Sequence, residues 1–380
     1  MNNLHISLTD FRNESRVLKQ ATTISSLSKI EHVYIAALHE ADLKKQEDIA
    51  DKISLKRFTL KTRSLSRDLL AQILKYFEFV FRILFFYKKK NIGIVNIHAL
   101  GLLPLGYLLK LIYGAKLIYD THELETETNG SRGFRKKLGK WIERLFIKKA
   151  DHVFVVSENI ADWYRDNYSI PRPTVVLNAP REQQVEKNDY FRDTFGLRKD
   201  QIIVLYQGGL AVGRGVDLLL EAFKKRTDDK VVMVFMGYGN LEEEIQAASK
   251  SYSTIFFHKA VSPNVLLSYT VSADVGISFI ENTCLSYYYC MPNKLFEYAM
   301  AGLPVIVSNM KEMREFVESH QMGVVVKEDT VESLNEAIEQ LLNMDLPLLK
   351  NNAKKAALNN SWAHQEVKMR TVYQTLLESA

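Results

Sequence analysis

Hydrophobic and polar positions along this chain alternate between short apolar runs and longer amphipathic segments. The short runs are rich in valine and isoleucine and predict strands in the first half at 5–8, 32–38, 92–97, 116–119 and 175–180. The segments between them follow a helical period, starting with a helix that ends near Leu27. Strands that alternate with helices predict an α/β fold with a parallel sheet.

The second half repeats the same alternation after a polar segment, 178–188, that we interpret as a linker. Its predicted strands are 202–206, 231–236, 273–278, 304–307 and 323–326, and a terminal helix runs over 361–377. A chain of 380 residues exceeds one ordinary core, so two domains are expected. We predict the domain ranges 1–182 and 189–357, followed by a terminal helical segment, 358–380.

Residues 69–90 are the most apolar stretch and end in three lysines. A membrane span needs about 20 apolar residues with few charges, and here Lys75, Glu78 and Arg82 interrupt the run. Their spacing places them on one helical face, so the stretch predicts an amphipathic helix that does not span a bilayer. Such a helix either lies on an anionic membrane surface or packs on the sheet.

Composition and charge further limit the class of protein and its expected location. Hydrophobic residues make up 47% and charged residues 25%, which is typical of a globular domain. The two cysteines, Cys284 and Cys290, match no metal motif and no disulfide framework, and no signal peptide is visible at the start, so we expect a cytoplasmic location. Residues 1–182 hold 30 Lys and Arg against 20 Asp and Glu. This excess indicates an anionic surface or acceptor on the first half, or charge that is merely solvated.

The stretch 291–307 combines a short helix with a buried strand. Asn293 is expected to be the N-cap, and Gly302, followed by Pro304, should end the helix. Glu297 is then expected in the first turn, where the helix dipole favours an acid. Alternatively, its carboxylate accepts hydrogen bonds from a sugar diol, with phosphate at the nearby free N–H groups.

Three further segments carry candidate chemistry. Asp120, His122 and Glu123 follow a predicted strand, and open α/β sheets bind ligands at the carboxyl ends of their strands. A glycine-rich loop with Arg214 follows the strand 202–206 and suits a phosphate, although tight turns use the same residues. The polar segment 10–16 could bond an acceptor hydroxyl or cap the next helix.

These motifs resemble the retaining GT-B glycosyltransferases of family four, also called glycosyltransferase group 1. The resemblance is strongest at 117–123, 202–217 and 291–307 and extends over nearly the whole chain. It implies two Rossmann-like domains that face each other across a cleft, with the terminal helix crossing back to the first. Its implied catalytic residues are His122, Glu123 and Asp120, with His122 beside the donor sugar. Its implied donor-binding residues are Gly208, Gly209, Arg214, Gly237, Gly239, Val261, Asn293, Lys294 and Glu297, with Glu297 on the ribose. The corresponding acceptor-side candidates are Asp10, Arg12, Asn13 and Arg16.

Two positions depart from the family pattern. Tyr289 stands where many members have the first acid of a Glu-x7-Glu pair, and Gly209 stands where they have an arginine for the diphosphate. Either the loss of this arginine weakens diphosphate binding or another cation replaces it, and Lys294 is the candidate for that replacement.

The resemblance implies transfer of a sugar, of the hexosyl type, from a nucleotide-diphosphate sugar to a hydroxyl with retention. The expected setting is cell-surface polysaccharide or glycolipid assembly, with a lipid-linked acceptor and peripheral binding to the inner face of the membrane among the options. No metal, other cofactor or nucleic-acid partner is expected. Alternatives are a nucleotide-sugar epimerase or hydrolase on the same fold, and a catalytically silent subunit that binds a sugar nucleotide.

Overall fold

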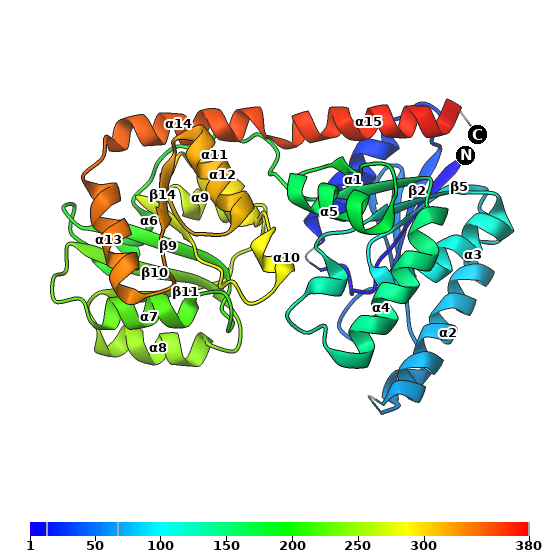
Figure 1. Ribbon diagram of the computed structural model, residues 1–380, viewed down its shortest axis with the longest axis horizontal. Helices are drawn as coiled ribbons and strands as arrows, with labels where there is room; N and C mark the ends of the chain where they lie inside the picture. Colours follow the sequence, from blue (N-terminus) through cyan, green and yellow to red (C-terminus); the bar gives the residue numbers. More distant parts are fainter. Residues whose placement is uncertain (13, 67, 379–380) are drawn as a thin grey trace. The chain divides into compact units, whose positions relative to one another are not determined.

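The computed structural model describes residues 1–380 except 13, 67, 379 and 380 (Figure 1). Two compact units make up the chain. The first unit contains Met1–Val176 together with Glu366–Ala380, and the second unit contains Leu177–Gln365. The unit boundaries thus fall at 176 and 365, where the sequence suggested 182 and 358. The terminal helix α15 (Trp362–Glu378) begins in the second unit, and its larger part belongs to the first.

The described residues of the first unit form an eight-stranded sheet in the order β3-β4-β2-β1-β5-β6-β7-β8. All neighbouring strands pair in parallel except the antiparallel β3 and β4. The strands are β1 (Asn2–Ile6), β2 (His32–Leu38), β3 (Gln46–Ala50), β4 (Ile53–Phe58), β5 (Ile92–Ile97), β6 (Lys116–Asp120), β7 (His152–Val155) and β8 (Thr174–Val175). The helices are α1 (Ser15–Ser25), α2 (Leu69–Tyr87), α3 (Leu103–Tyr113), α4 (Gly133–Phe146) and α5 (Glu158–Tyr168). Short 3-10 turns are η1 (Lys61–Ser64), η2 (Leu100–Leu102), η3 (Glu125–Glu127) and η4 (Ile147–Lys149).

Three sequence expectations for this unit were wrong. The first strand covers Asn2–Ile6 instead of 5–8. It begins earlier than predicted because the side-chain amide of buried Asn3 donates to the Asn96 side chain at 2.8 Å, which satisfies this polar residue inside the sheet. The hairpin of β3 and β4 was not predicted, because β3 is a polar edge strand whose residues are exposed or half-buried. The last strand ends at Val175 rather than at 180.

Described residues of the second unit form a six-stranded parallel sheet in the order β11-β10-β9-β12-β13-β14. Its strands are β9 (Ile202–Gly209), β10 (Val231–Tyr238), β11 (Ile255–Lys259), β12 (Val275–Ser278), β13 (Val305–Ser308) and β14 (Gly323–Val326). Its helices are α6 (Tyr190–Phe195), α7 (Val216–Lys224), α8 (Glu242–Ser251), α9 (Leu266–Thr270), α10 (Leu285–Tyr288), α11 (Asn293–Met300), α12 (Lys311–His320), α13 (Val331–Leu342) and α14 (Leu346–Asn359).

Both faces of this second sheet are buried, which explains its continuous apolar strands. Along β9, Val204 and Tyr206 join one hydrophobic core, whereas Ile203 and Leu205 join the other. Alternate side chains point to opposite faces of a strand, so each face needs its own apolar set.

Helix α11 differs from expectation at its start and agrees at its end. Pro292 is the N-cap and Asn293 is already helical, with no side-chain capping bond. Glu297 is therefore the fifth helical residue and lies in the second turn, so the helix dipole explains its presence less well. Gly302 has φ +69 directly after the C-cap Ala301, which confirms the predicted glycine stop.

The predicted amphipathic helix is present as α2, which covers 69–87 of the apolar stretch and ends before the three lysines. Within the described part of the chain, no helix combines the length and the apolar character that crossing a bilayer would require.

Candidate active site

The catalytic candidates of the first unit lie at the carboxyl ends of its strands, close to the point where the strand order reverses. β1 pairs with β2 on one side and with β5 on the other, and the chain continues outward in both directions. Open α/β sheets bind ligands at such a point, outside the carboxyl ends of the strands. Asp120 is the last residue of β6, and His98 directly follows the end of β5.

Asp120 is the centre of a buried hydrogen-bond network. Arg16 donates to its two carboxylate oxygens at 2.6 and 3.0 Å, and Gln20, one helical turn later in α1, donates at 2.6 Å. Burial alone would raise the pKa of Asp120, but the charge of Arg16 and the bonds from His122 and His98 outweigh it and hold the pKa well below its usual value. Asp120 is therefore ionised at neutral pH.

Two histidines extend this network inward. Nδ1 of His98 lies 3.2 Å from Asp120 Oδ2, and Nε2 of His98 lies 2.8 Å from Nδ1 of His5. Burial lowers the pKa of both rings, so each is neutral and carries one N–H. Asp120 is ionised and can only accept, so Nδ1 of His98 must carry a proton and donate to it. Nε2 of His98 then accepts from the Nδ1–H of His5.

His122 is the member of this network that reaches solvent. Its Nε2 lies 3.2 Å from Asp120 Oδ2, and 32% of its side chain is exposed. If Nε2 donates to Asp120, Nδ1 is left as the free ring nitrogen. Asp120 itself is completely buried and can act on a ligand only through such neighbours, whereas Glu123 is exposed.

The acceptor-side candidates separate in the structure. Arg12 is exposed and forms ion pairs with Asp10 at 2.7 Å and Asp42 at 2.6 Å. Arg16 is buried against Asp120, and its Nη1 also donates to the Val176 carbonyl at 2.6 Å, so it serves the network rather than the surface. Asn13 lies outside the described residues.

His98, Asp120 and His122 also have atoms close enough together to hold a metal ion. Both carboxylate oxygens of Asp120, however, already accept hydrogen bonds from the Arg16 guanidinium. A cation bound there would lie against a permanent positive charge, so these residues fit a hydrogen-bonded network better than a metal site.

In the second unit the strand order reverses between β9 and β12. The candidate glycines surround the carboxyl ends of β9 and β10, where they allow close approach of two backbones. A Cβ on Gly237 would lie 1.9 Å from the Gly208 carbonyl oxygen, and a Cβ on Gly239 would lie 2.1 Å from the Leu210 carbonyl oxygen. These two glycines are therefore required by packing at this edge of the sheet.

Lys294 and Arg214 bring two cations to the same edge. Lys294 Nζ lies 3.6 Å from the centroid of the Tyr206 ring, and a Cβ built on Gly208 would lie 3.6 Å from the same nitrogen. The Arg214 guanidinium lies 4.9 Å from the Tyr287 ring centroid. Burial, followed by repulsion from Arg214, lowers the pKa of Lys294 to about 7 against the smaller opposing effects of Glu297 and Cys290.

Glu297 is held in place by Gln207, a buried residue of β9. The Gln207 side-chain amide donates to Glu297 Oε2 at 2.5 Å, and its carbonyl oxygen accepts from Thr270 Oγ1 at 2.8 Å. The backbone N–H of Gln207 donates to the Tyr298 hydroxyl at 2.9 Å. This arrangement fixes the orientation of the Glu297 carboxylate beside the carboxyl end of β9.

The remaining donor-side candidates lie around this cluster. Ala260, next to Val261, donates its N–H to the Gly237 carbonyl at 3.1 Å, which places Val261 beside β10. Asn293 is exposed at the start of α11, one residue before Lys294. Gly209 is exposed, and a Cβ there would meet nothing within 4 Å, so packing does not explain why glycine replaces the arginine of the family pattern.

Sequence reasoning missed several members of the two clusters. His98 follows a strand end just as Asp120 does, so the same rule could have found it. His5, Gln20 and Gln207 gave no such signal, because each is a buried polar residue whose partner is distant in sequence.

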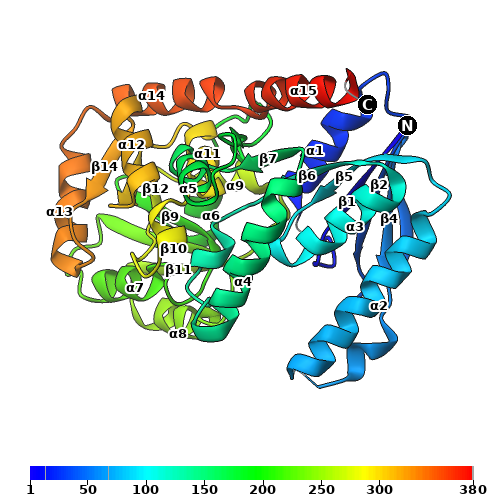
Figure 2. The ribbon, with the colours of Figure 1, turned by 45° about the vertical axis from the view of Figure 1, so that its right-hand side comes forward.

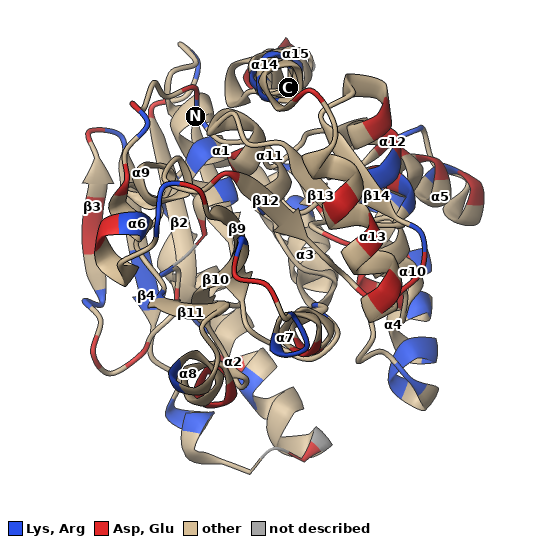
Figure 3. Cartoon of the chain, turned by 90° about the vertical axis from the view of Figure 1, so that its left-hand side faces the viewer, with Lys and Arg blue, Asp and Glu red and all other residues tan. Residues whose placement is uncertain are grey.

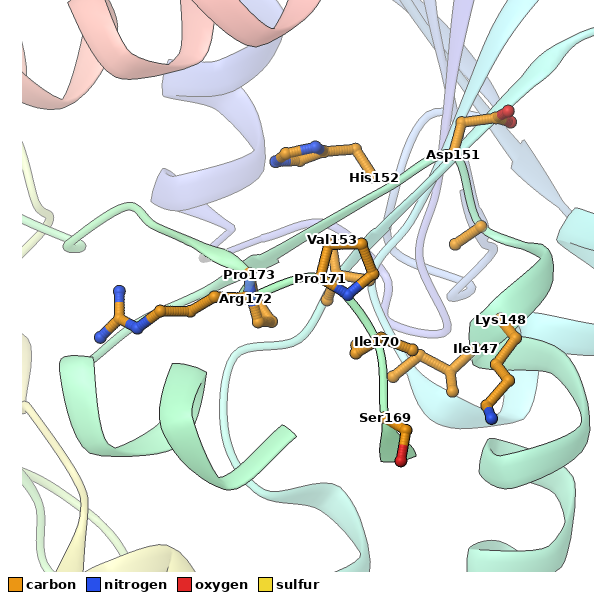
Figure 4. A pocket seen from close by; sticks show the side chains of 11 residues that line it. Ile147, Lys148, Asp151, His152, Val153, Ser169, Ile170, Pro171, Arg172 and Pro173 are labelled. Carbon is orange, nitrogen blue, oxygen red and sulfur yellow. The ribbon is translucent and has the colours of Figure 1, made fainter. Parts of the chain in front are cut away.

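A pocket of about 280 Å³ lies elsewhere in the first unit and is shown in Figure 4. Its lining includes Asp151 and His152 at the beginning of β7 and Arg172 before β8. These are the amino ends of the strands, whereas the Asp120 network lies at the carboxyl ends. The pocket is therefore separate from the candidate site.

Comparison with solved structures defines the class of fold. Sucrose-phosphate synthase from Thermosynechococcus elongatus matches with a TM-score of 0.81 and 16% identity, over 100% of both chains. The Anabaena protein Alr3699/HepE, solved in complex with UDP-glucose, matches with a TM-score of 0.74 and 12% identity, over 99% of this chain and 100% of that one. The chain thus has the GT-B fold of two Rossmann-like domains.

Sequence profiles identify the family. The profile described as "Glycosyl transferases group 1" matches residues 187–359, and the profile "Glycosyltransferase Family 4" matches residues 31–179. This chain belongs to the group 1, family four glycosyltransferases. An uncharacterized glycosyltransferase of Methanocaldococcus jannaschii, MJ1069, is 23% identical over 246 residues, which span 60% of this chain and 59% of that relative.

Proposed function

We propose that this protein transfers a hexosyl group from a nucleotide-diphosphate sugar to a hydroxyl acceptor with retention of anomeric configuration. The observation that carries the proposal is the cluster of Arg214, Lys294 and Glu297 at the carboxyl end of β9. The bond between the anomeric carbon and the diphosphate oxygen breaks, a bond to the acceptor oxygen forms, and the acceptor loses its hydroxyl proton. The diphosphate leaves with the negative charge.

Stabilising that charge is the main task of the second unit. Arg214 and Lys294 place two cations near the glycine-rich end of β9, where hydrogen bonds and charge can act on the departing diphosphate without a metal. We propose that Glu297, oriented by Gln207, accepts hydrogen bonds from the ribose hydroxyls. His122, held by Asp120, is the group we propose to contact the donor sugar.

The proposed setting is the cytoplasm, in polysaccharide or glycolipid assembly. A panel of nucleotide sugars in thermal-shift measurements would identify the donor, because a ligand that binds only the native state raises the apparent stability. Donor consumption with and without a hydroxyl acceptor then separates three possibilities. A transferase needs the acceptor, an epimerase or hydrolase does not, and a silent subunit binds without turnover. NMR of the product would show whether configuration is retained.

Donor binding provides the first prediction. Replacing Glu297 by glutamine and Arg214 by alanine should each weaken nucleoside-diphosphate binding by roughly 1.5–3 kcal/mol, the cost of losing a hydrogen bond to a charged group. Glu297 acts through the ribose and Arg214 through the phosphates. Calorimetric titration measures both losses. Lys250→Ala is a control, because this exposed lysine of α8 belongs to neither cluster. Unchanged affinity in both variants would remove the donor-site assignment.

Lys294 makes donor binding depend on pH. In the free protein its amine is half-protonated near pH 7, because burial and Arg214 lower its pKa to about 7. A bound diphosphate favours the charged amine, so binding takes up a proton, and affinity should fall as the pH rises above 7. Titrations between pH 6.5 and 9 with the donor nucleotide sugar, whose diphosphate stays ionised over this range, measure the slope. In Lys294→Met the donor affinity should be lower at pH 6.5, and the decrease of affinity with pH that Lys294 causes should disappear. An identical slope in both proteins would show that another group titrates.

A further inference from the structure

Exposed apolar side chains are concentrated on three helices of the first unit, α2, α3 and α4. Among the side chains of these helices that the structure describes, thirteen large apolar ones are exposed: Leu70, Ile73, Leu74, Phe77, Phe81, Phe85, Phe86, Leu111, Ile112, Phe134, Leu138, Trp141 and Leu145. Scattered single apolar residues are normal on a protein surface, whereas a grouping of this kind marks an interaction surface.

The three helices are neighbours in one layer (Figure 2). Tyr113 at the end of α3 donates its hydroxyl to the Leu84 carbonyl of α2 at 2.7 Å. On the other side of α3, the rings of Tyr107 and Phe146, which belongs to α4, lie 5.8 Å apart. Their exposed side chains therefore belong to one region of the first unit.

Helix α2 packs Phe79, Ile83 and Tyr87 against the first unit and also turns a second apolar stripe to solvent. Leu70, Leu74, Phe77, Phe81 and Phe85 follow a helical spacing and are all exposed, Phe85 to 76%. The charged side chains on another face are bound by nearby chain: Glu78 accepts from the Lys61 and Thr62 N–H groups at 2.8 Å and pairs with Arg82, and Lys75 donates to the Leu65 carbonyl at 2.9 Å. A helix that merely covers a sheet needs only the buried apolar face and is polar on its solvent side.

Helix α4 also exposes an apolar stripe. Phe134, Leu138, Trp141 and Leu145 lie on one helical stripe and are exposed, Phe134 to 70% and Trp141 to 61%. The face turned to the protein holds Glu143, which is fully buried and accepts hydrogen bonds from three tyrosine hydroxyls, among them Tyr164 at 2.8 Å. Two separate helices thus expose apolar stripes in the same layer.

The charge around these stripes is positive. Residues 132–149 contain eight lysines and arginines, and their one acid is the buried Glu143. Figure 3 shows Lys and Arg segments along α4. The exposed Lys88–Lys90 triplet follows the end of α2. An apolar stripe flanked by cations is the pattern of a helix that lies in the interface of an anionic bilayer.

We propose that the surface formed by α2, α3 and α4 docks on an anionic lipid bilayer. The aromatic and aliphatic stripes enter the boundary between headgroups and acyl chains, and the flanking cations contact the headgroups. A second copy of the chain is a poor occupant, because a two-fold contact would place this positive surface against itself. The inference rests on the proposed function in one respect: a membrane-bound enzyme meets a lipid-linked acceptor there, although docking itself requires no turnover.

Trp141 allows the contact to be observed directly. Trp362 is buried and Trp163 is half-buried, so Trp141 is the tryptophan whose surroundings change most on docking. With vesicles containing phosphatidylglycerol at low salt, the emission should shift to the blue and be quenched by lipids brominated in the acyl chain. Phosphatidylcholine vesicles or high salt should weaken both effects. In Trp141→Phe the shift should be lost while co-sedimentation persists.

Variants test the two components of the surface separately. Phe134→Ser with Leu138→Ser should remove acyl-chain contact, and Lys88–Lys90 changed to glutamates should reduce vesicle co-sedimentation severalfold. Matched controls are Leu348→Ser with Leu358→Ser, also exposed leucines, and Lys199→Glu with Lys250→Glu, also exposed lysines, all four in the second unit. These controls should bind as the parent protein does.

The proposal is wrong if the protein stays in the supernatant with anionic vesicles at low salt, or if the control variants lose binding as strongly as the surface variants. It is also wrong if Phe134→Ser abolishes a concentration-dependent dimer in sedimentation velocity while vesicles bind nothing, because the surface then joins two copies. Vesicle binding without sugar transfer would support docking and contradict the proposed function. Transfer to a soluble acceptor without vesicle binding would support the proposed function and contradict docking.

Discussion

Replacing His122 by alanine should lower turnover about 10²–10³-fold, the usual effect of removing one preorganised group that stabilises a transition state. Nucleotide affinity should change little, since the proposed donor cluster of Arg214, Lys294 and Glu297 lies in the second unit and His122 lies in the first. Its ring is oriented by Asp120 through a 3.2 Å contact and is partly exposed, which suits a group that contacts the donor sugar. Single-turnover kinetics and calorimetric titration measure the two quantities.

His364→Ala is a suitable control for this experiment, because His364 is also an exposed histidine and belongs to neither cluster. Equal losses of turnover and nucleotide affinity in His122→Ala would place His122 at the nucleotide itself. Unchanged turnover would remove it from the site.

Replacing Arg16 by methionine should lower the free energy of unfolding by about 3–5 kcal/mol, the cost of leaving a buried charge without its partner. The side chains of Arg16 and Asp120 are 3% and 0% exposed and lie 2.6 Å apart. Without the guanidinium, buried Asp120 loses the charge that contributes most to lowering its pKa, so that pKa should rise. Urea unfolding at pH 7 measures the loss of stability, which should become smaller as the pH falls and Asp120 is protonated.

An exposed ion pair gives the matched control. Arg198 and Asp229 lie 2.7 Å apart, but about half of each side chain is exposed. Arg198→Met should therefore cost no more than about 1 kcal/mol. Losses of similar size in the two variants would show that solvent screens the Arg16 pair as well.

The strand-end rule and the helix-stop residues predicted much of what the structure shows. Asp120 and His122 were located because a run of apolar residues ends there, and Gly302 because only a short segment separates helix from strand. The partners of these residues could not be inferred. Gln20 reaches Asp120 across 100 positions, and Gln207 reaches Glu297 across 90, so only the folded chain brings them together.

The exposed apolar stripes of α2 and α4 could not be located from the sequence. The sequence showed that α2 has a wide apolar face, but not which part of that face stays exposed once Phe79 and Ile83 have packed. Contacts from distant segments help to fix both helices: backbone N–H groups of η1 bind Glu78, and tyrosine hydroxyls bind Glu143. Both partners are recruited by tertiary packing rather than by the local period.

The division of the chain into units has a consequence for how the protein folds during synthesis. The first unit is completed by residues from 366 onward, and Met369 and Tyr373 of this segment are fully buried. The Asn96 amide, which lies in β5, donates to the Tyr373 hydroxyl, so even the sheet has a partner in this segment. Domains usually fold in the order in which they leave the ribosome. Here the second unit, a single continuous stretch, can finish first, whereas the first unit must wait, incomplete, until the last helix emerges.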